Sequence, residues 1–212
     1  QHTARADVAI IGSGIAGLWL AHRLHRAGRT VVMLESRRVG SGQTVASQGI
    51  IHGGTKYALT NRITGASEAI SAMPARWRAA LKAGGEVDLT GANLLSDCQH
   101  LWSHRSVPAR IATFFAASVM RNRVSSLPRE RHPSLLAHRD FAGSVYRIDE
   151  LVFDVPSVLA RLAAVSGVRI LKVDGAPLGV DAAAPAVQCT CIHDGAAREL
   201  RLEAAAIVCT AG

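Results

Sequence analysis

Three glycines near the N-terminus have the spacing of a phosphate-binding turn. The run Gly12–Gly17 reads Gly-Ser-Gly-Ile-Ala-Gly, directly after an apolar segment and at the start of a helical pattern. Gly12 permits a tight turn, Gly14 lets the backbone approach a pyrophosphate, and Gly17 allows close helix–strand packing. Phosphates would then face backbone N–H groups and the positive end of a helix dipole. The spacing predicts a dinucleotide site formed by Gly12, Ser13, Gly14, Ile15, Ala16 and Gly17.

An acidic residue stands where the sugar of such a nucleotide is expected. Glu35 ends the next apolar run, 18 positions after Gly17, and a carboxylate there can accept hydrogen bonds from ribose hydroxyls. Such charged hydrogen bonds contribute about 1.5–3 kcal/mol, and the carboxylate repels a 2′-phosphate. We expect Ser36 and Arg37 to complete this part of the site. The motif by itself fits either FAD or NAD.

The elements that must position these residues form a strand–helix–strand unit. Residues 7–11 are a short continuous apolar run typical of a strand buried on both faces. Residues 15–26 have helical spacing with Gly28 as the stop, and residues 30–34 form a second β-branched run. The pattern predicts an α/β fold, Rossmann-like, with a central parallel sheet.

The rest of the chain divides into an insertion and a return to the same fold. We predict helices over 66–82, broken or kinked at Pro74, and over 108–122. From Val155 we predict a helix to Val165 and a strand over 168–173.

Two strands, 186–192 and 198–202, flank an Asp-Gly turn at 193–195, and a last buried strand covers 206–212. The predicted domains are 1–60 (βαβ unit and following loop), 61–150 (inserted, partly helical substrate region) and 151–212 (return).

Composition narrows the function classes. With 49% apolar residues the chain can fill a core, and no apolar run reaches the roughly 20 residues of a membrane span. The net charge of +8, with arginines dense over 105–139, suits an anionic partner, but 4% aromatic residues disfavour nucleic acid. The cysteines lack zinc-site spacing, so we predict no metal. Residues 1–6 lack the apolar core of a secretory signal, so we expect a cytoplasmic protein.

The first quarter of the chain resembles a known flavoenzyme family. Asp7–Glu35, followed by the glycine-rich segment Gly40–Gly54, resembles the D-amino-acid oxidase-like superfamily, which includes glycine and sarcosine oxidases. The resemblance implies FAD as the cofactor and non-covalent binding. It also implies that five residues lie along the flavin ribityl chain and ring: Thr44, Ala46, Ser47, Gln48 and Gly49.

Resemblance also supplies candidates for catalysis. Ile51–Gly54 with Lys56 is similar to an Ile/Leu-His-x-Gly pattern of L-2-hydroxyglutarate oxidase and flavin-linked glycerol-3-phosphate dehydrogenase. His52 could accept a proton from a hydroxyl or amine being oxidised, with Lys56 pairing an anionic substrate group. A hydrogen-bonded loop histidine is an equally good interpretation of His52.

The second half of the chain resembles the family's return to the FAD domain. The closing Thr210, Ala211 and Gly212 are similar to an Ala/Thr-Gly turn near the cofactor. Val173 would touch adenine, unless that place falls at Pro177. Because such enzymes usually continue beyond this turn, we expect the chain to be the N-terminal part of a longer enzyme.

These observations predict an FAD-dependent oxidoreductase that oxidises a C–H bond next to an amine or hydroxyl of a small anionic substrate. Three alternatives remain: an NAD-dependent oxidoreductase, a non-catalytic dinucleotide-binding module of a split protein, and a flavoprotein acting on RNA bases. Neither the substrate nor the electron acceptor can be identified from the sequence.

Overall fold

The protein forms two compact units in a computed structural model that describes residues 2–54, 70–103, 124–165, 167–175, 179–181 and 184–211. The first unit contains Gln1–Ser47, Ala80–Ala92 and Val155–Gly212. The second contains Gln48–Ala79 and Asn93–Asp154. These units are defined by contacts between residues, whereas the predicted domains 1–60, 61–150 and 151–212 were defined by their roles. The predicted division therefore stays a prediction.

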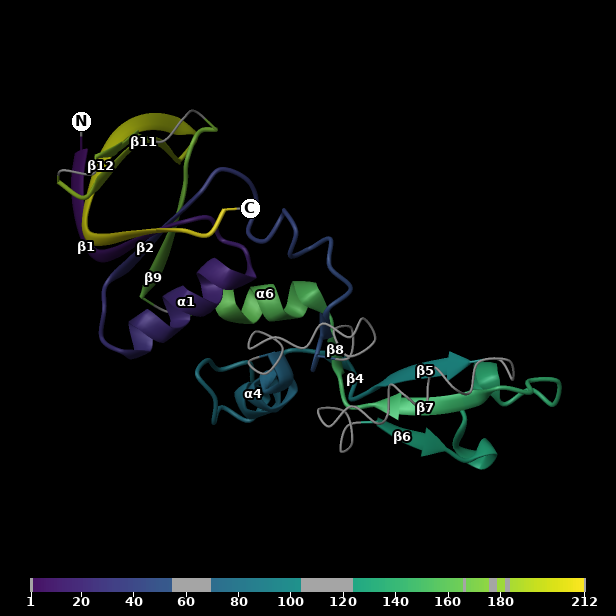
Figure 1. The fold of residues 1–212 in the computed structure, drawn as a ribbon. Helices are drawn as coiled ribbons and strands as arrows, with labels where there is room; N and C mark the ends of the chain where they lie inside the picture. The colour runs from purple at the N-terminus through teal and green to yellow at the C-terminus, as the bar shows by residue number, and fades with distance from the viewer. Residues whose placement is uncertain are drawn as a thin grey trace. The chain divides into compact units, whose positions relative to one another are not determined.

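A six-stranded sheet with the order β10-β11-β12-β1-β2-β9 organises the first unit (Figure 1). Its strands are β1 (His2–Ile11), β2 (Val31–Glu35), β9 (Val168–Lys172), β10 (Gly179–Asp181), β11 (Ala186–His193) and β12 (Ala196–Cys209). The pairs β12–β1, β1–β2 and β2–β9 are parallel, whereas β10–β11 and β11–β12 are antiparallel. The predicted α/β class with central parallel strands is confirmed, and the sheet as a whole is mixed.

One helix lies against this sheet, where it contacts β1, β2 and β9, and a second helix packs beside the first (Figure 1). Helix α1 (Ile15–Arg26) occupies the predicted residues, and α6 (Val155–Ala163) begins as predicted, with Pro156 in its first turn. Gly28 adopts a φ of +75° just after α1, which glycine tolerates without strain. Every residue of β2 except Glu35 is buried, as expected for a parallel strand covered on both faces.

The opposite face of the sheet is covered by β11, because the sheet curls until β11 contacts the end of β9. The Asp174 N–H donates to the Thr190 carbonyl (2.8 Å) and Val173 bridges to Cys191, so β11 reaches the end of β9. This arrangement encloses an apolar cluster of buried residues from β1, β2, β11, β12 and the end of β9. Its members are Ala9, Val32, Leu34, Val173, Val187, Cys189, Leu200, Leu202 and Ala204.

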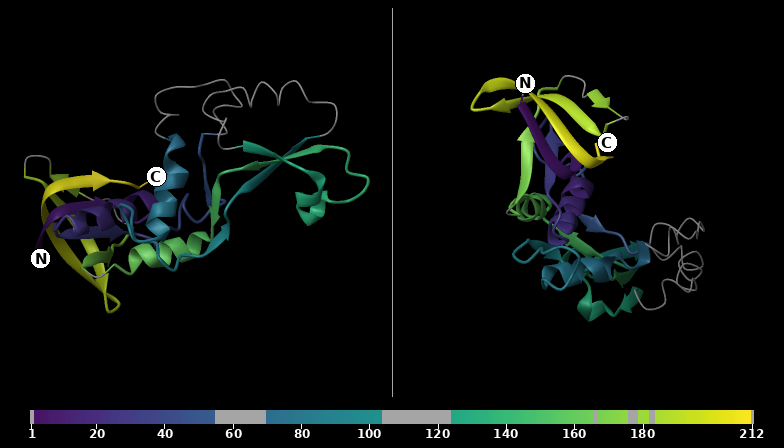
Figure 2. Two further views of the ribbon diagram at one scale, coloured as in Figure 1. Left: turned by 90° about the horizontal axis from the view of Figure 1, so that it is seen from below. Right: turned by 90° about the vertical axis from the view of Figure 1, so that its left-hand side faces the viewer.

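Strand β12 differs from the prediction. The separate strands expected at 198–202 and 206–212 are one strand that changes partner along its length, and its course beside β1 is visible in Figure 2. Residues 196–203 pair with β11, and residues 200–209 pair with β1. The small side chains of Ala204–Ala206 at the change of partner lack the β-branched signal of a strand, which explains why the sequence suggested a break.

The second unit contains two small antiparallel sheets that the sequence did not predict. One sheet has the order β3-β8-β4 and the other β5-β7-β6. Their strands are β3 (Ile50–Ile51), β4 (Leu94–Ser96), β5 (Gln99–Ser103), β6 (Val124–Leu127), β7 (Ser144–Ile148) and β8 (Leu151–Phe153). Short 3-10 turns, η1 (Arg129–Arg131) and η2 (Ser134–Leu136), connect β6 to β7. Strands this short carry too few residues for a period-2 pattern to be recognised.

The helix predicted at 66–82 is interrupted next to Pro74, as predicted: residues 70 and 71 are helical, and Ala72 forms a turn before a new helix begins. Helix α4 covers Met73–Leu81, so Pro74 lies in its first turn, where a missing backbone N–H breaks no intrahelical bond. Residues 66–69 and the helix predicted at 108–122 lie outside the described residues. Among the helices that are described, none combines the length and apolar character needed to cross a bilayer.

One buried histidine makes the first unit sensitive to acid. His22 on α1 is buried, and its Nε2 accepts the Asp88 N–H (3.3 Å) while its Nδ1 has no hydrogen-bond partner in the described part of the chain. Burial, with a smaller contribution from Arg26, lowers the pKa of His22 below its usual 6.5. The unfolded chain therefore takes up the proton first as the pH falls, so the stability is present above about pH 6.5 and is lost as the pH falls through the folded pKa.

We expect His22→Gln to make the protein less sensitive to mild acid. The glutamine carbonyl can still accept the Asp88 N–H but carries no titratable proton. Thermal unfolding between about pH 7.5 and pH 5.5, around the unfolded histidine pKa, should show a smaller fall in Tm for the variant than for the wild type. His193→Gln, at an exposed hairpin position, should keep the wild-type slope; equal slopes for all three proteins would contradict the assignment.

Candidate cofactor site

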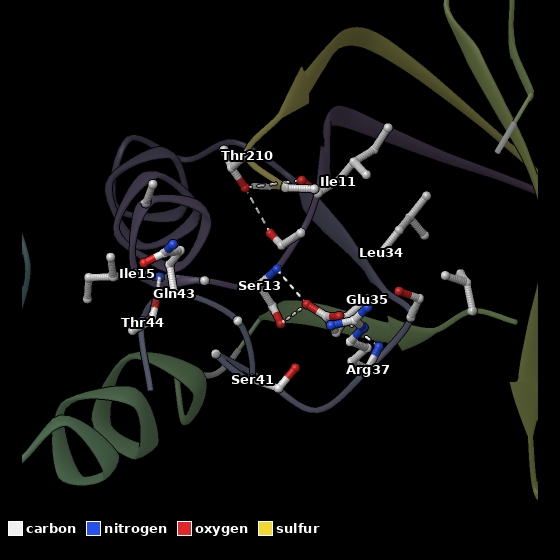
Figure 3. Close-up of a pocket in the computed structure, with 18 of the residues that line it drawn as sticks. Ile11, Ser13, Ile15, Leu34, Glu35, Arg37, Ser41, Gln43, Thr44 and Thr210 are labelled. Carbon is white, nitrogen blue, oxygen red and sulfur yellow. Dashed lines mark hydrogen bonds between the residues drawn. The ribbon is translucent and has the colours of Figure 1, made fainter. Parts of the chain in front are cut away.

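A cavity of about 520 Å³ opens where four parallel strands end, the place at which open α/β sheets bind ligands. Its volume is within the range of about 300–1,000 Å³ that is usual for ligand pockets. The residues that line it come from the turns and loops after β1, β2, β9 and β12 (Figure 3). They are Ile11–Ala16, Leu34–Arg37, Gly40–Thr44, Val173–Gly175, Thr210 and Ala211.

The glycine turn is packed too closely for side chains at two positions. Gly12 has a φ of +98°, and a Cβ there would lie 2.8 Å from the Ala211 N. A Cβ on Gly17 would collide with the Gly12 carbonyl oxygen. Gly17 therefore supports the pocket from outside its lining, as the predicted role in helix–strand packing requires.

Thr210 joins the end of β12 to this turn. Its N–H donates to the Ile11 carbonyl (2.8 Å), and its hydroxyl lies 3.1 Å from that oxygen and 3.0 Å from the Gly12 carbonyl oxygen. Figure 3 shows the hydroxyl directed at both carbonyls. The two segments, almost two hundred residues apart in sequence, thus form one wall of the pocket.

The start of α1 presents backbone donors to the cavity. Gly14 is the N-cap and provides no side-chain cap, and the first turn carries no acidic residue. The Ile15 N–H donates to the Thr44 hydroxyl (3.0 Å). Because the first four N–H groups of a helix have no intrahelical acceptor, the neighbouring amides suit the oxygens of a pyrophosphate.

Glu35 is held by the turn on the other side of the cavity. Its Oε2 accepts the Ser13 N–H (2.9 Å) and the Ser13 hydroxyl (2.6 Å), and its Oε1 accepts the Arg37 N–H (2.7 Å). Ser13 is completely buried. These bonds, drawn in Figure 3, fix the carboxylate at the rim of the glycine turn and leave acceptor capacity on Oε1 for a sugar hydroxyl.

Electrostatics keep Glu35 ionised. Burial acts to raise the pKa of Glu35, but the Ser13 hydroxyl, the two backbone N–H donors and the charge of Lys172 together hold that pKa below its usual value. Lys172 also donates to the carbonyls of Ser36 (2.6 Å) and Arg37 (3.2 Å), which fixes the loop after β2. The site therefore presents a negative charge to a ribose and repels a 2′-phosphate.

Most of the predicted cofactor residues meet in this cavity. Those in its lining are Gly12, Ser13, Gly14, Ile15, Ala16, Glu35, Ser36, Arg37, Thr44, Val173, Thr210 and Ala211. Ala46 and Ser47 lie in the first unit but outside the lining, and Gln48 and Gly49 belong to the second unit. Gly212, Lys56 and Pro177 lie outside the described residues. All the proposed contacts with FAD stay predictions.

Several lining residues were missed. Gly40–Gln43 belong to the glycine-rich segment that the family resemblance had already singled out, and the Gly40 N–H donates to the Ser13 carbonyl (3.0 Å). Ile11 and Leu34 are the strand ends next to predicted residues. Asp174 and Gly175 had no local signal, because the pairing of Val173 with Cys191 places them there.

The predicted catalytic histidine lies in the second unit beside a buried acid. His52 follows β3, and its half-exposed ring approaches Glu150 with an Nδ1–Oε2 distance of 3.1 Å. The Glu150 side chain is 4% exposed and also accepts the Gly53 N–H (2.7 Å). His52 is therefore held by hydrogen bonding while one side of its ring remains accessible.

Comparisons with known proteins agree with this arrangement. The model of a family described as FAD dependent oxidoreductase, DAO, matches residues 7–212. A probable FAD-dependent oxidoreductase of Pseudomonas aeruginosa, PA4991, is 50% identical over 165 residues, which are 78% of this chain and 42% of that protein. The chain thus spans less than half the length of this curated relative.

Solved structures share the fold. The crystal structure of PA4991 has a TM-score of 0.72 and 39% identity, covering all of this chain and 49% of that one. Glycine oxidase from Geobacillus kaustophilus has a TM-score of 0.67 at 18% identity, covering 98% of this chain and 55% of that one. The resemblance found in the sequence is confirmed, and with it FAD as the cofactor; the NAD alternative is not favoured.

We expect Glu35→Gln to weaken FAD binding about 10- to 100-fold, because a hydrogen bond to a charged group contributes about 1.5–3 kcal/mol. The amide also offers a donor where the Ser13 and Arg37 N–H groups require an acceptor. Titration of flavin-free protein with FAD, followed by flavin fluorescence, measures the change. Glu199→Gln, at an exposed residue of β12, is the matched control and should bind like the wild type.

Gly14→Val should give folded protein without flavin colour. Gly14 has a φ of −71°, so valine meets no backbone strain. The valine Cβ, however, would lie 3.2 Å from the Thr44 hydroxyl, where the cavity would hold the pyrophosphate. Circular dichroism and the visible spectrum of the purified variant test this expectation. Gly179→Val on β10, where a Cβ makes ordinary contact with Gln188, should stay yellow. Full flavin content in Gly14→Val would show that the flavin does not bind at the glycine turn.

Proposed function

The chain belongs to the DAO family of FAD-dependent oxidoreductases, and from this we propose that it forms the FAD-binding part of an enzyme that oxidises a C–H bond next to an amine or hydroxyl. The observation that carries the proposal is the cavity at the strand ends, with the glycine turn on one side and an ionised Glu35 on the other. No covalent attachment is needed in such a site.

The described residues fit the ADP half of FAD. The N-terminal amides of α1 would hold the pyrophosphate, and Glu35 would accept a ribose hydroxyl. Val173 lines the cavity beyond Glu35, and its N–H donates to the Glu35 carbonyl (2.9 Å). We propose that the adenine lies beside Val173, with Asp174 and Gly175 completing that end.

The segment that leaves the cavity would follow the rest of the cofactor. Thr44 lines the pocket, and eight residues later the same segment reaches His52. We propose that Ala46, Ser47, Gln48 and Gly49 accompany the ribityl chain and ring.

Bound FAD would supply the acceptor for the two electrons and the hydrogen that leave the substrate carbon. The task of the protein is then to orient the substrate and to remove a proton from its amine or hydroxyl. With Oε2 of Glu150 within hydrogen-bond distance of Nδ1, the Nε2 of His52 is the ring atom suited to take that proton.

A small anionic substrate is the class that we propose. Lys56 would pair with its carboxylate or phosphate, as predicted from the sequence, and the net charge of +8 favours the approach of anions. The described fold offers no argument for the RNA alternative. A cytoplasmic location stays a prediction.

The direct test has two parts. Denaturing the purified protein should release FAD, and release of NAD or of no nucleotide would contradict the proposal. Anaerobic mixing of the yellow protein with small amino acids and 2-hydroxy acids should then bleach the flavin with at least one of them. Full FAD content without bleaching by any of these compounds would favour the non-catalytic module.

We expect His52→Asn to slow flavin reduction by about 10²- to 10⁴-fold, the usual contribution of a general base, without loss of FAD. Stopped-flow absorbance with the reducing substrate measures the rate. His100→Asn, at an exposed histidine of β5 in the same unit, should leave the rate unchanged. A wild-type rate in His52→Asn would show that His52 is not the base and has only a structural role in its loop.

A further inference from the structure

We propose that Glu150 is a positioning residue that fixes His52 in the tautomer with hydrogen on Nδ1, leaving Nε2 as the proton acceptor. This inference rests on the proposed role of His52 as the base. Glu150 was not among the residues singled out from the sequence, because nothing in its local sequence links it to residue 52.

The pairing of two strands brings these residues together. In the antiparallel pair β3–β8, Ile50 is opposite Val152 and Ile51 is opposite Leu151. The next position in this register places His52 opposite Glu150, just outside the ladder. The approach of the ring to the carboxylate is therefore set by backbone pairing in the interior of the second unit, since Leu151 is 1% exposed.

The carboxylate of Glu150 is surrounded by donors. Its Oε1 accepts the buried Gly53 N–H (2.7 Å), and its Oε2 accepts the side-chain amide of Gln99 (3.0 Å). Gln99 begins β5, which pairs with β7 at Ile148, close before Glu150 in the chain. Three backbone segments thus converge on one acid that is 3% exposed.

These contacts determine which ring nitrogen of His52 carries the hydrogen. Both oxygens of Glu150 act as acceptors toward Gly53 and Gln99, so we infer that the Nδ1 lying 3.1 Å from Oε2 donates to the carboxylate as well. The other nitrogen, Nε2, then keeps its lone pair, and the fixed ring directs that lone pair away from Glu150. The same device orients histidines that bind metals or act as bases in other enzymes.

A purely structural role for Glu150 would be to anchor the turn at Gly53. A neutral glutamine could do this at nearly the same size, without the cost of burying a carboxylate. A charged acceptor has a use of its own when the neighbouring histidine must take up a proton and become positive. The two roles make different predictions for Glu150→Gln.

Glu150→Gln should invert the tautomer of His52. The Gly53 N–H is a fixed backbone donor, so the carbonyl of the introduced amide must face it and the NH₂ group must face Nδ1. The Gln99 amide, which donates to Oε2 in the wild type, then turns to present its oxygen to the new NH₂ group. Nδ1 then becomes the acceptor and Nε2 carries the hydrogen, so the histidine can act as the base only through its less populated tautomer. The turn keeps its anchor, so the variant should fold and bind FAD normally.

The experiment uses the FAD-loaded full-length protein labelled with ¹⁵N-histidine, in which long-range ¹H–¹⁵N correlations report the tautomer directly. His52→Asn identifies the His52 signals. We expect the wild type to show hydrogen on Nδ1 and Glu150→Gln to show it on Nε2. Flavin reduction by the compound found in the test above should slow about 10- to 100-fold, the usual effect of losing such a partner, through kcat rather than KM.

Asp149→Asn is the matched control. Asp149 precedes Glu150 on the same turn, but it pairs with Arg78 instead of His52, so this variant should keep the wild-type tautomer and rate. A wild-type tautomer in Glu150→Gln would overturn the inference. If the tautomer inverts while the reduction rate stays the same, the positioning by Glu150 is supported and the failure lies in the role proposed for His52.

Discussion

The structure depends on a close approach between two stretches of backbone that leaves no room for a side chain. The turn at Gly12 lies against Thr210 and Ala211, and α1 starts directly above it because Gly17 has no Cβ. This contact sets the distance between the end of β1 and the start of α1. The helix amides, the carbonyls bound by Thr210 and the position of Ser13 all follow from it, and so does the shape of the cavity.

Ser13 links the glycine turn to the end of β2. It is completely buried, and its backbone and hydroxyl both donate to Glu35. The position of the Glu35 carboxylate therefore depends on the geometry of the glycine turn, and the same carboxylate presents the charge that a ribose would meet. Lys172 extends the link to β9 by holding the loop after Glu35. Four strands contribute to the site, and local hydrogen bonds keep their ends in register.

The parts of the fold that could be predicted are those in which a local signal and the tertiary structure agree. The glycine turn, α1 with Gly28 after it, and Glu35 at the end of β2 belong to one contiguous unit, and their residues were identified from spacing alone. Long-range pairing determines what was missed. Asp174 enters the cavity through the contact of β9 with β11, and Glu150 meets His52 through β3 and β8. The strands of the second unit are too short for their periodicity to be visible.

The unbroken course of β12 has a consequence for changes in chain length. Strand β12 pairs with β11 at one end and with β1 at the other. It therefore fixes the distance between the exposed hairpin at His193–Gly195 and Thr210. Extra residues in the hairpin tip alter neither register, and a reporter peptide could be inserted there. One residue added or removed near Ala205 would turn the following side chains to the opposite face and separate the Thr210 hydroxyl from the glycine turn.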